Sequence, residues 1–149
     1  MKTIKYFFEF IFIYTLLIIF KIIGYKNASN FGAIIGKKIG PLFRSNAKIQ
    51  SNLSNSNIGI SQEDRNSIIE NMWSNYGRIL SEYVYLKKFR NNDLNQFIEI
   101  EGLTYLSEIK NNNEQVVFIS GHFNNFELMA MEIEKAGIDL CAIYRPLNN

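Results

Sequence analysis

The chain has 149 residues, of which 47% are hydrophobic and 20% are charged. That length suits one domain with its own core, and that composition excludes an intrinsically disordered chain. The net charge of +2 is too small to indicate a nucleic-acid-binding protein, and no basic stripe interleaved with aromatic residues stands out. A single cysteine, Cys141, excludes an intramolecular disulfide, and with a single histidine, His122, we expect no metal site.

The first predicted element is a strongly apolar segment, residues 6–23, whose only charges are Glu9 and Lys21. The uncharged stretch between them is shorter than the roughly 20 residues that span a bilayer, but both charged side chains can extend toward the interfaces. We therefore predict a membrane anchor over residues 1–26. Two alternatives stay open, a buried core helix and a secretory signal, although no small-residue cleavage site follows the apolar stretch.

The next stretch, residues 31–44, mixes apolar side chains with Lys37, Lys38 and Arg44. This mixture is typical of a helix on an anionic membrane surface, and equally of an amphipathic helix on a soluble domain. Residues 45–61 are rich in Asn and Ser, so we expect a connection, with a helical turn around residues 48–53.

A long helix is predicted to begin after Ser61. Ser61 is a suitable N-cap, and Asp64 three residues later is the acidic half of a capping box. Large apolar residues then recur at spacings of three and four, which places them on one helical face. We expect this face to belong to the core; its members are Ile69, Met72, Trp73, Tyr76, Leu80 and Tyr83.

The remainder of the chain is predicted to be α/β. Residues 97–100 alternate as in a short strand, and residues 103–109 have helical spacing. Two apolar runs, residues 115–119 and 140–144, are typical of buried strands, and residues 124–135 between them have a helical pattern. Strand, helix and strand form a βαβ unit, whose strands are normally parallel. We therefore expect an N-terminal helical region followed by a βαβ unit of a mixed, mainly parallel sheet.

The only histidine, His122, follows the first predicted strand of that unit, where ligands of α/β proteins collect. Gly121 permits a close approach of substrate, and Glu127 lies five residues after His122. On a helix that spacing separates two side chains by about 140°, so the pair can meet only if His122 lies in the strand-to-helix turn. A carboxylate bonded to one imidazole nitrogen leaves the other free to remove a proton from a hydroxyl. The pattern indicates a general base and its partner; a histidine that only caps a helix is the alternative.

Four blocks of the sequence, in order, resemble one known family. The residues G-H-F-N-N-F-E at 121–127 resemble the H-x₄-D/E signature of the glycerolipid acyltransferases. More narrowly, they are similar to the H-x-G-N-W-E form of the lipid A biosynthesis lauroyl/myristoyl acyltransferase family. The other three blocks are N-M-W-S-N-Y-G-R-I-L-S-E at 71–82, I-E-G-L at 100–103 and Y-R-P-L-N-N at 144–149.

Within the motif, His122, Asn125 and Glu127 match the residues of that family. Asn124 stands where Gly is usual, and Phe126 stands where Trp is usual. The two differences keep the catalytic pair and leave the acyl-chain preference open.

The resemblance implies an O-acyltransferase that moves a fatty acyl chain from acyl carrier protein to a hydroxyl of a lipid A precursor. The reaction would take place at the cytoplasmic side of the inner membrane. It would need no cofactor, and acylated acyl carrier protein would be the donor substrate. His122 would be the general base and Glu127 its orienting partner. Gly121, Asn125 and Arg145 would bind substrate.

The resemblance also bears on domain organisation. Residues 27–149 would be the N-terminal part of an acyltransferase domain, because a further arginine-containing block of the family is expected after residue 149. Activity of this chain by itself is then open. The alternatives are an acyltransferase for another membrane lipid, such as a phosphatidylinositol mannoside or an aminolipid, and an inert membrane-attached fragment.

Overall fold

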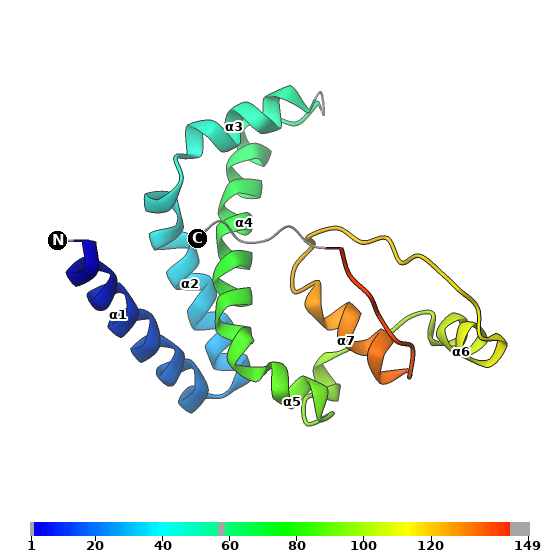
Figure 1. The fold of residues 1–149 in the computed structure, drawn as a ribbon. Coiled ribbons are helices and arrows are strands. Elements are labelled where there is room, and N and C mark those ends of the chain that lie inside the picture. The colour runs from blue at the N-terminus through cyan, green and yellow to red at the C-terminus, as the bar shows by residue number, and fades with distance from the viewer. Residues whose placement is uncertain (1, 57–58, 144–149) are drawn as a thin grey trace. The chain divides into compact units, whose positions relative to one another are not determined.

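The computed structural model describes residues 2–56 and 59–143, and the chain forms two compact units, residues 1–85 and residues 86–149 (Figure 1). The helices of the first unit are α1 (Lys2–Ile23), α2 (Tyr25–Phe43), α3 (Asn46–Asn55), α4 (Gln62–Glu82) and the short 3₁₀ turn η1 (Tyr83–Tyr85). The second unit contains α5 (Leu86–Arg90), η2 (Asn95–Phe97), α6 (Leu103–Asn112) and α7 (Glu127–Lys135). The sequence-based division into residues 1–26 and 27–149 stays a prediction.

The first unit is built on a close pair of helices, α2 and α4, which make far more contacts than any other pair. A Cβ added to Gly36 would meet the carbonyl oxygen of Trp73, and a Cβ added to Gly77 would meet that of Gly32. Ser74 and Ser81 are buried in the same unit. Small residues therefore let the two backbones approach, which gives the pair its dense packing.

The predicted start of α4 is confirmed. The Ser61 hydroxyl accepts a hydrogen bond from the Asp64 backbone N–H at 3.1 Å and donates one to the Asp64 carboxylate at 2.7 Å. The predicted core face of α4 is wrong in part: Ile69 is buried, but Tyr76 and Leu80 are exposed. The helix turns its small residues to α2, because only these permit the close approach, and its larger side chains lie at the edge.

The connection predicted at residues 45–61 does contain a helix around residues 48–53, and this helix is longer than the expected single turn. Ten of its residues form α3, and Arg65 of α4 donates a hydrogen bond to the Ser54 hydroxyl at 2.6 Å. Asn and Ser disfavour helices mainly through competing local hydrogen bonds. Here side-chain bonds to neighbouring carbonyls, such as Ser54 to Gln50 at 2.9 Å, are made within the helix itself.

Helix α1 is long and apolar enough between Ile4 and Ile23 to cross a membrane, and 6% of that window is buried. It is therefore not a buried core helix in this structure. Its last turn is attached to the rest of the unit: the Tyr85 hydroxyl donates a hydrogen bond to the Phe20 carbonyl, and both side chains are buried. The Phe20 ring also meets that of Phe31 edge to face, with centroids 6.1 Å apart.

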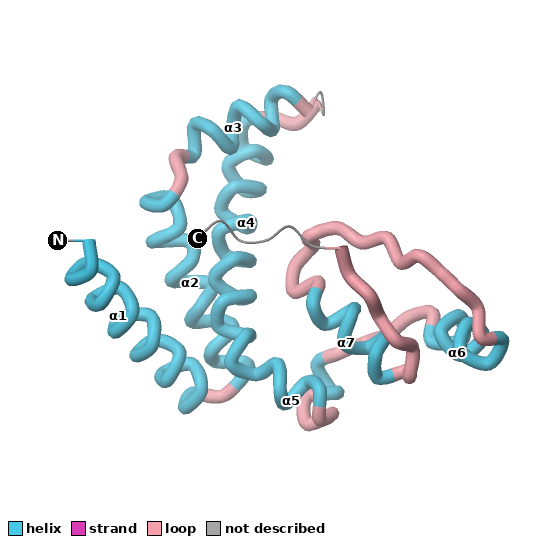
Figure 2. Tube along the Cα trace, in the orientation of Figure 1, coloured by secondary structure: helices cyan, strands magenta, loops and turns pink. Residues whose placement is uncertain are grey.

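The predicted α/β fold class is wrong for the part of the chain that the structure describes. Figure 2 shows helices and loops but no strand in residues 2–56 and 59–143. Residues 97–100, 115–119 and 140–143 are irregular or in η2, and of the βαβ unit only the helix forms, as α7. A strand exists through hydrogen bonds to a neighbouring strand, and no such neighbour lies beside these segments among the described residues. Tyr144 lies outside the described residues.

Candidate active site

Gly121, His122, Asn125 and Glu127 all lie in the connection that leads into α7 or at its start. The Phe123 N–H donates to the Gly121 carbonyl at 2.8 Å, which makes a tight turn around His122. The Leu128 N–H donates to the Asn125 carbonyl at 3.1 Å, just as the helix begins. His122 is therefore in the turn that precedes the helix and not on the helix, as the spacing to Glu127 requires.

Asn124 explains how the turn tolerates a departure from the usual motif. Its φ is 46°, in the left-handed region that Gly enters freely and Asn enters more easily than other residues. The position that usually carries Gly therefore keeps a backbone conformation suited to Gly. Phe126 retains an aromatic ring at the position where Trp is usual.

The imidazole of His122 is exposed and lies edge-on to the Phe126 ring, with centroids 4.6 Å apart and an angle of 64° between the planes. Glu127 is half-buried and is the first residue of α7, where the helix dipole favours a negative charge. The described contacts do not include a hydrogen bond between His122 and Glu127. The structure thus brings both residues to one turn, and their action as a pair stays a prediction.

Asn125 is the most unusual polar residue of the turn. Its side-chain nitrogen and oxygen are both buried and have no hydrogen-bond partner among the described residues. Leaving a buried amide unpaired costs about 1–3 kcal/mol, so such a group is found where water or a ligand completes it. This observation is compatible with the substrate-binding role expected for Asn125. Arg145, the other expected substrate-binding residue outside the turn, lies beyond the described residues.

An apolar cavity of about 580 Å³ lies on one side of α7. Its walls include Phe97, Ile100, Leu106, Phe118, Leu128 and Ile133, and three carboxylates, of Glu99, Glu101 and Glu132, also line it. Sequence reasoning missed this cavity, because the wall residues come from separate segments and were assigned to strand and helix cores. A volume of this size is within the range of small-ligand sites.

A second cavity, of about 570 Å³, lies along the other side of α7 and is lined by Glu127. Lys87 and Arg90 contribute two positive charges to it. His122 lines neither cavity, but Glu127 and Leu128 place the start of α7 between the two.

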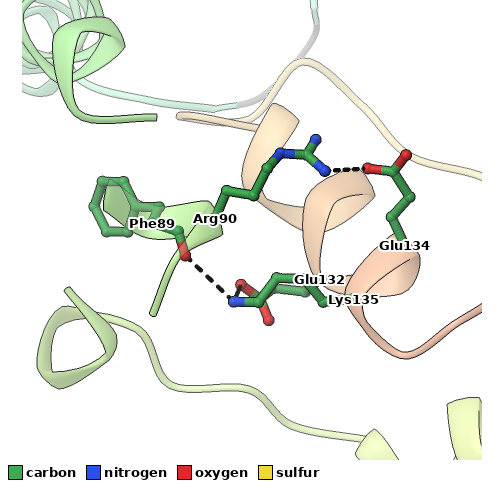
Figure 3. Close-up of polar contacts among 5 residues, drawn as sticks. All are labelled: Phe89, Arg90, Glu132, Glu134 and Lys135. Atoms are coloured by element: carbon green, nitrogen blue, oxygen red, sulfur yellow. Dashed lines mark hydrogen bonds and ion pairs between the residues drawn. The ribbon is translucent and has the colours of Figure 1, made fainter. Parts of the chain in front are cut away.

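The C-terminal half of α7 is held by polar contacts to α5 (Figure 3). The Arg90 guanidinium lies 2.9 Å from the Glu134 carboxylate. Lys135 donates to the Phe89 carbonyl at 3.3 Å and pairs with Glu132 at 2.7 Å. Two of these contacts, Arg90 to Glu134 and Lys135 to Phe89, join α7 to α5 at the end of the helix away from His122.

Comparison with known proteins gives the family. Neither a search of curated proteins nor a search of solved structures returned a match. The sequence does match the family described as bacterial lipid A biosynthesis acyltransferase, over residues 1–149. The resemblance based on four short blocks is thereby confirmed, and this chain belongs to the bacterial lipid A biosynthesis acyltransferase family.

Proposed function

We propose that this chain carries the catalytic base of an O-acyltransferase that moves a fatty acyl group from acyl carrier protein to a hydroxyl of a lipid A precursor. The observation that carries the proposal is the position of His122. It is an exposed imidazole in the turn before α7, with Glu127 at the first helical position, in a chain of an acyltransferase family.

The chemistry needs one base. A neutral imidazole nitrogen of His122 removes the proton of the acceptor hydroxyl while the oxygen attacks the thioester carbonyl of the acyl donor. The tetrahedral intermediate collapses, the carbon–sulfur bond breaks, and the imidazolium returns its proton to the departing thiolate. The Glu127 carboxylate stabilises the imidazolium and holds the tautomer in which the reacting nitrogen is free.

The apolar cavity beside α7 supports an acyl substrate. A hydrocarbon chain gains free energy by leaving water, at about 0.8 kcal/mol for each buried CH₂ group. Leu128 lines that cavity one residue after Glu127, so a chain seated there has its reacting end near the catalytic turn. We assign the acyl chain of the donor to this cavity.

The apolar helix α1 supports a membrane location, which suits substrates that carry lipid chains. Acyl carrier protein is a soluble donor, so the reaction belongs at the cytoplasmic side of the inner membrane.

The test is transfer of labelled acyl groups from acyl carrier protein to a lipid A precursor by membrane-embedded protein. His122→Ala should lower kcat by on the order of 10² to 10⁴ and leave the fold intact, since the imidazole is exposed. Glu127→Gln should lower kcat more than it raises KM, and the double variant should be scarcely slower than His122→Ala.

Ser120→Ala is the matched control, because Ser120 is adjacent in sequence and has no part in the mechanism. Turnover by His122→Ala at the rate of this control would refute His122 as the base. Absence of transfer by the folded, unsubstituted chain with every acceptor lipid offered would favour the inert fragment.

A further inference from the structure

The contact between α2 and α4 leaves a shallow apolar groove of about 160 Å³ on one side, which we call the seam groove. Every residue that lines it is glycine, aliphatic or aromatic. The large side chains are those of Phe20, Ile35, Ile39, Phe43, Trp73, Tyr76 and Leu80. Four of the lining residues are the glycines at which the two helices approach each other, so the groove runs along the line of closest contact.

The rim of the seam groove is open to solvent. Phe43 is 84% exposed and Tyr76 is 59% exposed, although both have large apolar surfaces. Leu42, next to Phe43, is 83% exposed as well. Large apolar side chains gathered on one surface mark a site of association, because their exposure to water is unfavourable.

Two observations identify what covers this surface. The first is continuity with α1: Phe20 of that helix lines the groove, and the rest of α1 exposes apolar side chains over Ile4–Ile23. The groove therefore begins at the last turn of α1, the helix that exposes these apolar side chains.

The second observation is charge. Lys37 is paired with Glu70 at 2.7 Å, whereas the exposed side chains of Lys38 and Arg44 have no ion pair among the described residues. Lys38 and Arg44 flank the groove residues Ile39 and Phe43 in sequence. Apolar side chains bordered by unpaired cations complement lipid tails beneath anionic headgroups.

We propose that the seam groove rests in the surface of a bilayer that contains anionic phospholipid, as a second membrane contact beside α1. Phe43, Tyr76 and Leu80 enter the boundary between headgroups and acyl chains, and Lys38 and Arg44 meet phosphates. This contact is independent of the acyl-transfer chemistry and holds whatever the acceptor lipid is.

The test uses the full chain in vesicles of phosphatidylcholine with phosphatidylglycerol whose acyl chains carry bromine. In a Cys141→Ser background, an environment-sensitive fluorophore is attached at Phe43→Cys or Tyr76→Cys. Ile13→Cys, exposed on α1, reports insertion of that helix, and Asn71→Cys, exposed on α4 and outside the groove, is the matched control. Bromine should quench the probes at 13, 43 and 76 and leave the probe at 71 bright.

Charge removal sharpens the result. In phosphatidylglycerol vesicles, Lys38→Gln or Arg44→Gln should each lower about five-fold the ratio of protein whose seam groove is bound to the bilayer to protein whose groove is not. The loss of binding is measured as recovered fluorescence of the probe at position 43. In vesicles of phosphatidylcholine alone, neither substitution should change the emission. Quenching at 13 but not at 43 and 76 would overturn the proposal while leaving α1 as an anchor. A spectral shift at 43 that depends on protein concentration and not on bromine would replace it with self-association.

Discussion

The two units of this chain differ in how far their expected elements form. In the first unit the predicted helix after Ser61 forms, and glycine and serine residues form its contact with α2. In the second unit, segments that read as buried strands lie in the open: Val117 is 87% exposed and Ile119 is 92% exposed. A helix satisfies its own backbone, whereas a strand needs a neighbour, so only the first kind of element is complete within its own residues.

The largest effect is expected at the glycine contact. Gly77→Val should lower the free energy of unfolding by about 3 kcal/mol or more, because the new side chain meets the Gly32 carbonyl and forces the helices apart. Gly59→Val is the matched control, since nothing lies within 4 Å of a Cβ there. Thermal unfolding in detergent measures both. Equal stability of the two variants would mean that the pair is not as tight as the structure has it.

The polar network beside that contact should matter less. The Arg78 guanidinium donates hydrogen bonds to the Ser29 hydroxyl and to the side-chain oxygen of Asn30, each at 3.0 Å. The Ser29 hydroxyl in turn donates one to the Glu82 carboxylate at 2.9 Å. Arg78→Ala should cost about 1–3 kcal/mol, because the part-buried Ser29 hydroxyl loses its donor. Breaking the exposed Lys37–Glu70 pair with Glu70→Gln should cost at most about 1 kcal/mol. Chemical denaturation measures the free energy of unfolding of both variants. A larger loss for Glu70→Gln than for Arg78→Ala would mean that the exposed ion pair stabilises the unit more than the polar network does.

In the second unit, we expect that Asn125 can be replaced by an apolar residue without loss of stability. Asn125→Leu keeps the approximate size of the side chain and removes an unpaired buried amide, so the free energy of unfolding should stay unchanged or rise by up to about 1–3 kcal/mol. Acyl transfer should fall in the same variant if substrate completes the amide. Marked destabilisation would show that Asn125 is a structural residue with partners in solution.

The smallest effect concerns alkaline pH. Burial raises the pKa of the Tyr25 hydroxyl, with a further rise from the Glu82 carboxylate, and burial also raises the pKa of Tyr85. The folded state therefore keeps these protons when the unfolded chain loses them, near pH 10. Their contribution to stability is full below that pH and declines as pH rises toward the folded pKa values. Tyr25→Phe and Tyr85→Phe should reduce this decline in alkaline titrations of unfolding, whereas Tyr105→Phe, an exposed tyrosine, should not.

Sequence reasoning succeeded where the determinants are local. Ser61 and Asp64 defined the start of α4, and the five-residue spacing placed His122 in the turn before α7. It failed where the determinant is a partner. The aromatic stripe of α4 obeyed helical spacing, but the face that packs was the one with Gly77 and Ser81, whose small size carries little signal in a search for apolar periodicity. The cavity beside α7 was invisible for the same reason, since its walls come from segments far apart in the sequence.

The hydrogen bond from Tyr85 to the Phe20 carbonyl bears on how far the first unit can lie from a membrane that α1 crosses. It satisfies a backbone carbonyl in the last turn of α1, and the chain passes into α2 through the single residue Gly24. A helix of 20 residues is about 30 Å long, which is the thickness of the hydrocarbon layer. With α1 across that layer, we expect this hydrogen bond and the one-residue connection to hold the first unit close to the headgroups and not on a flexible tether.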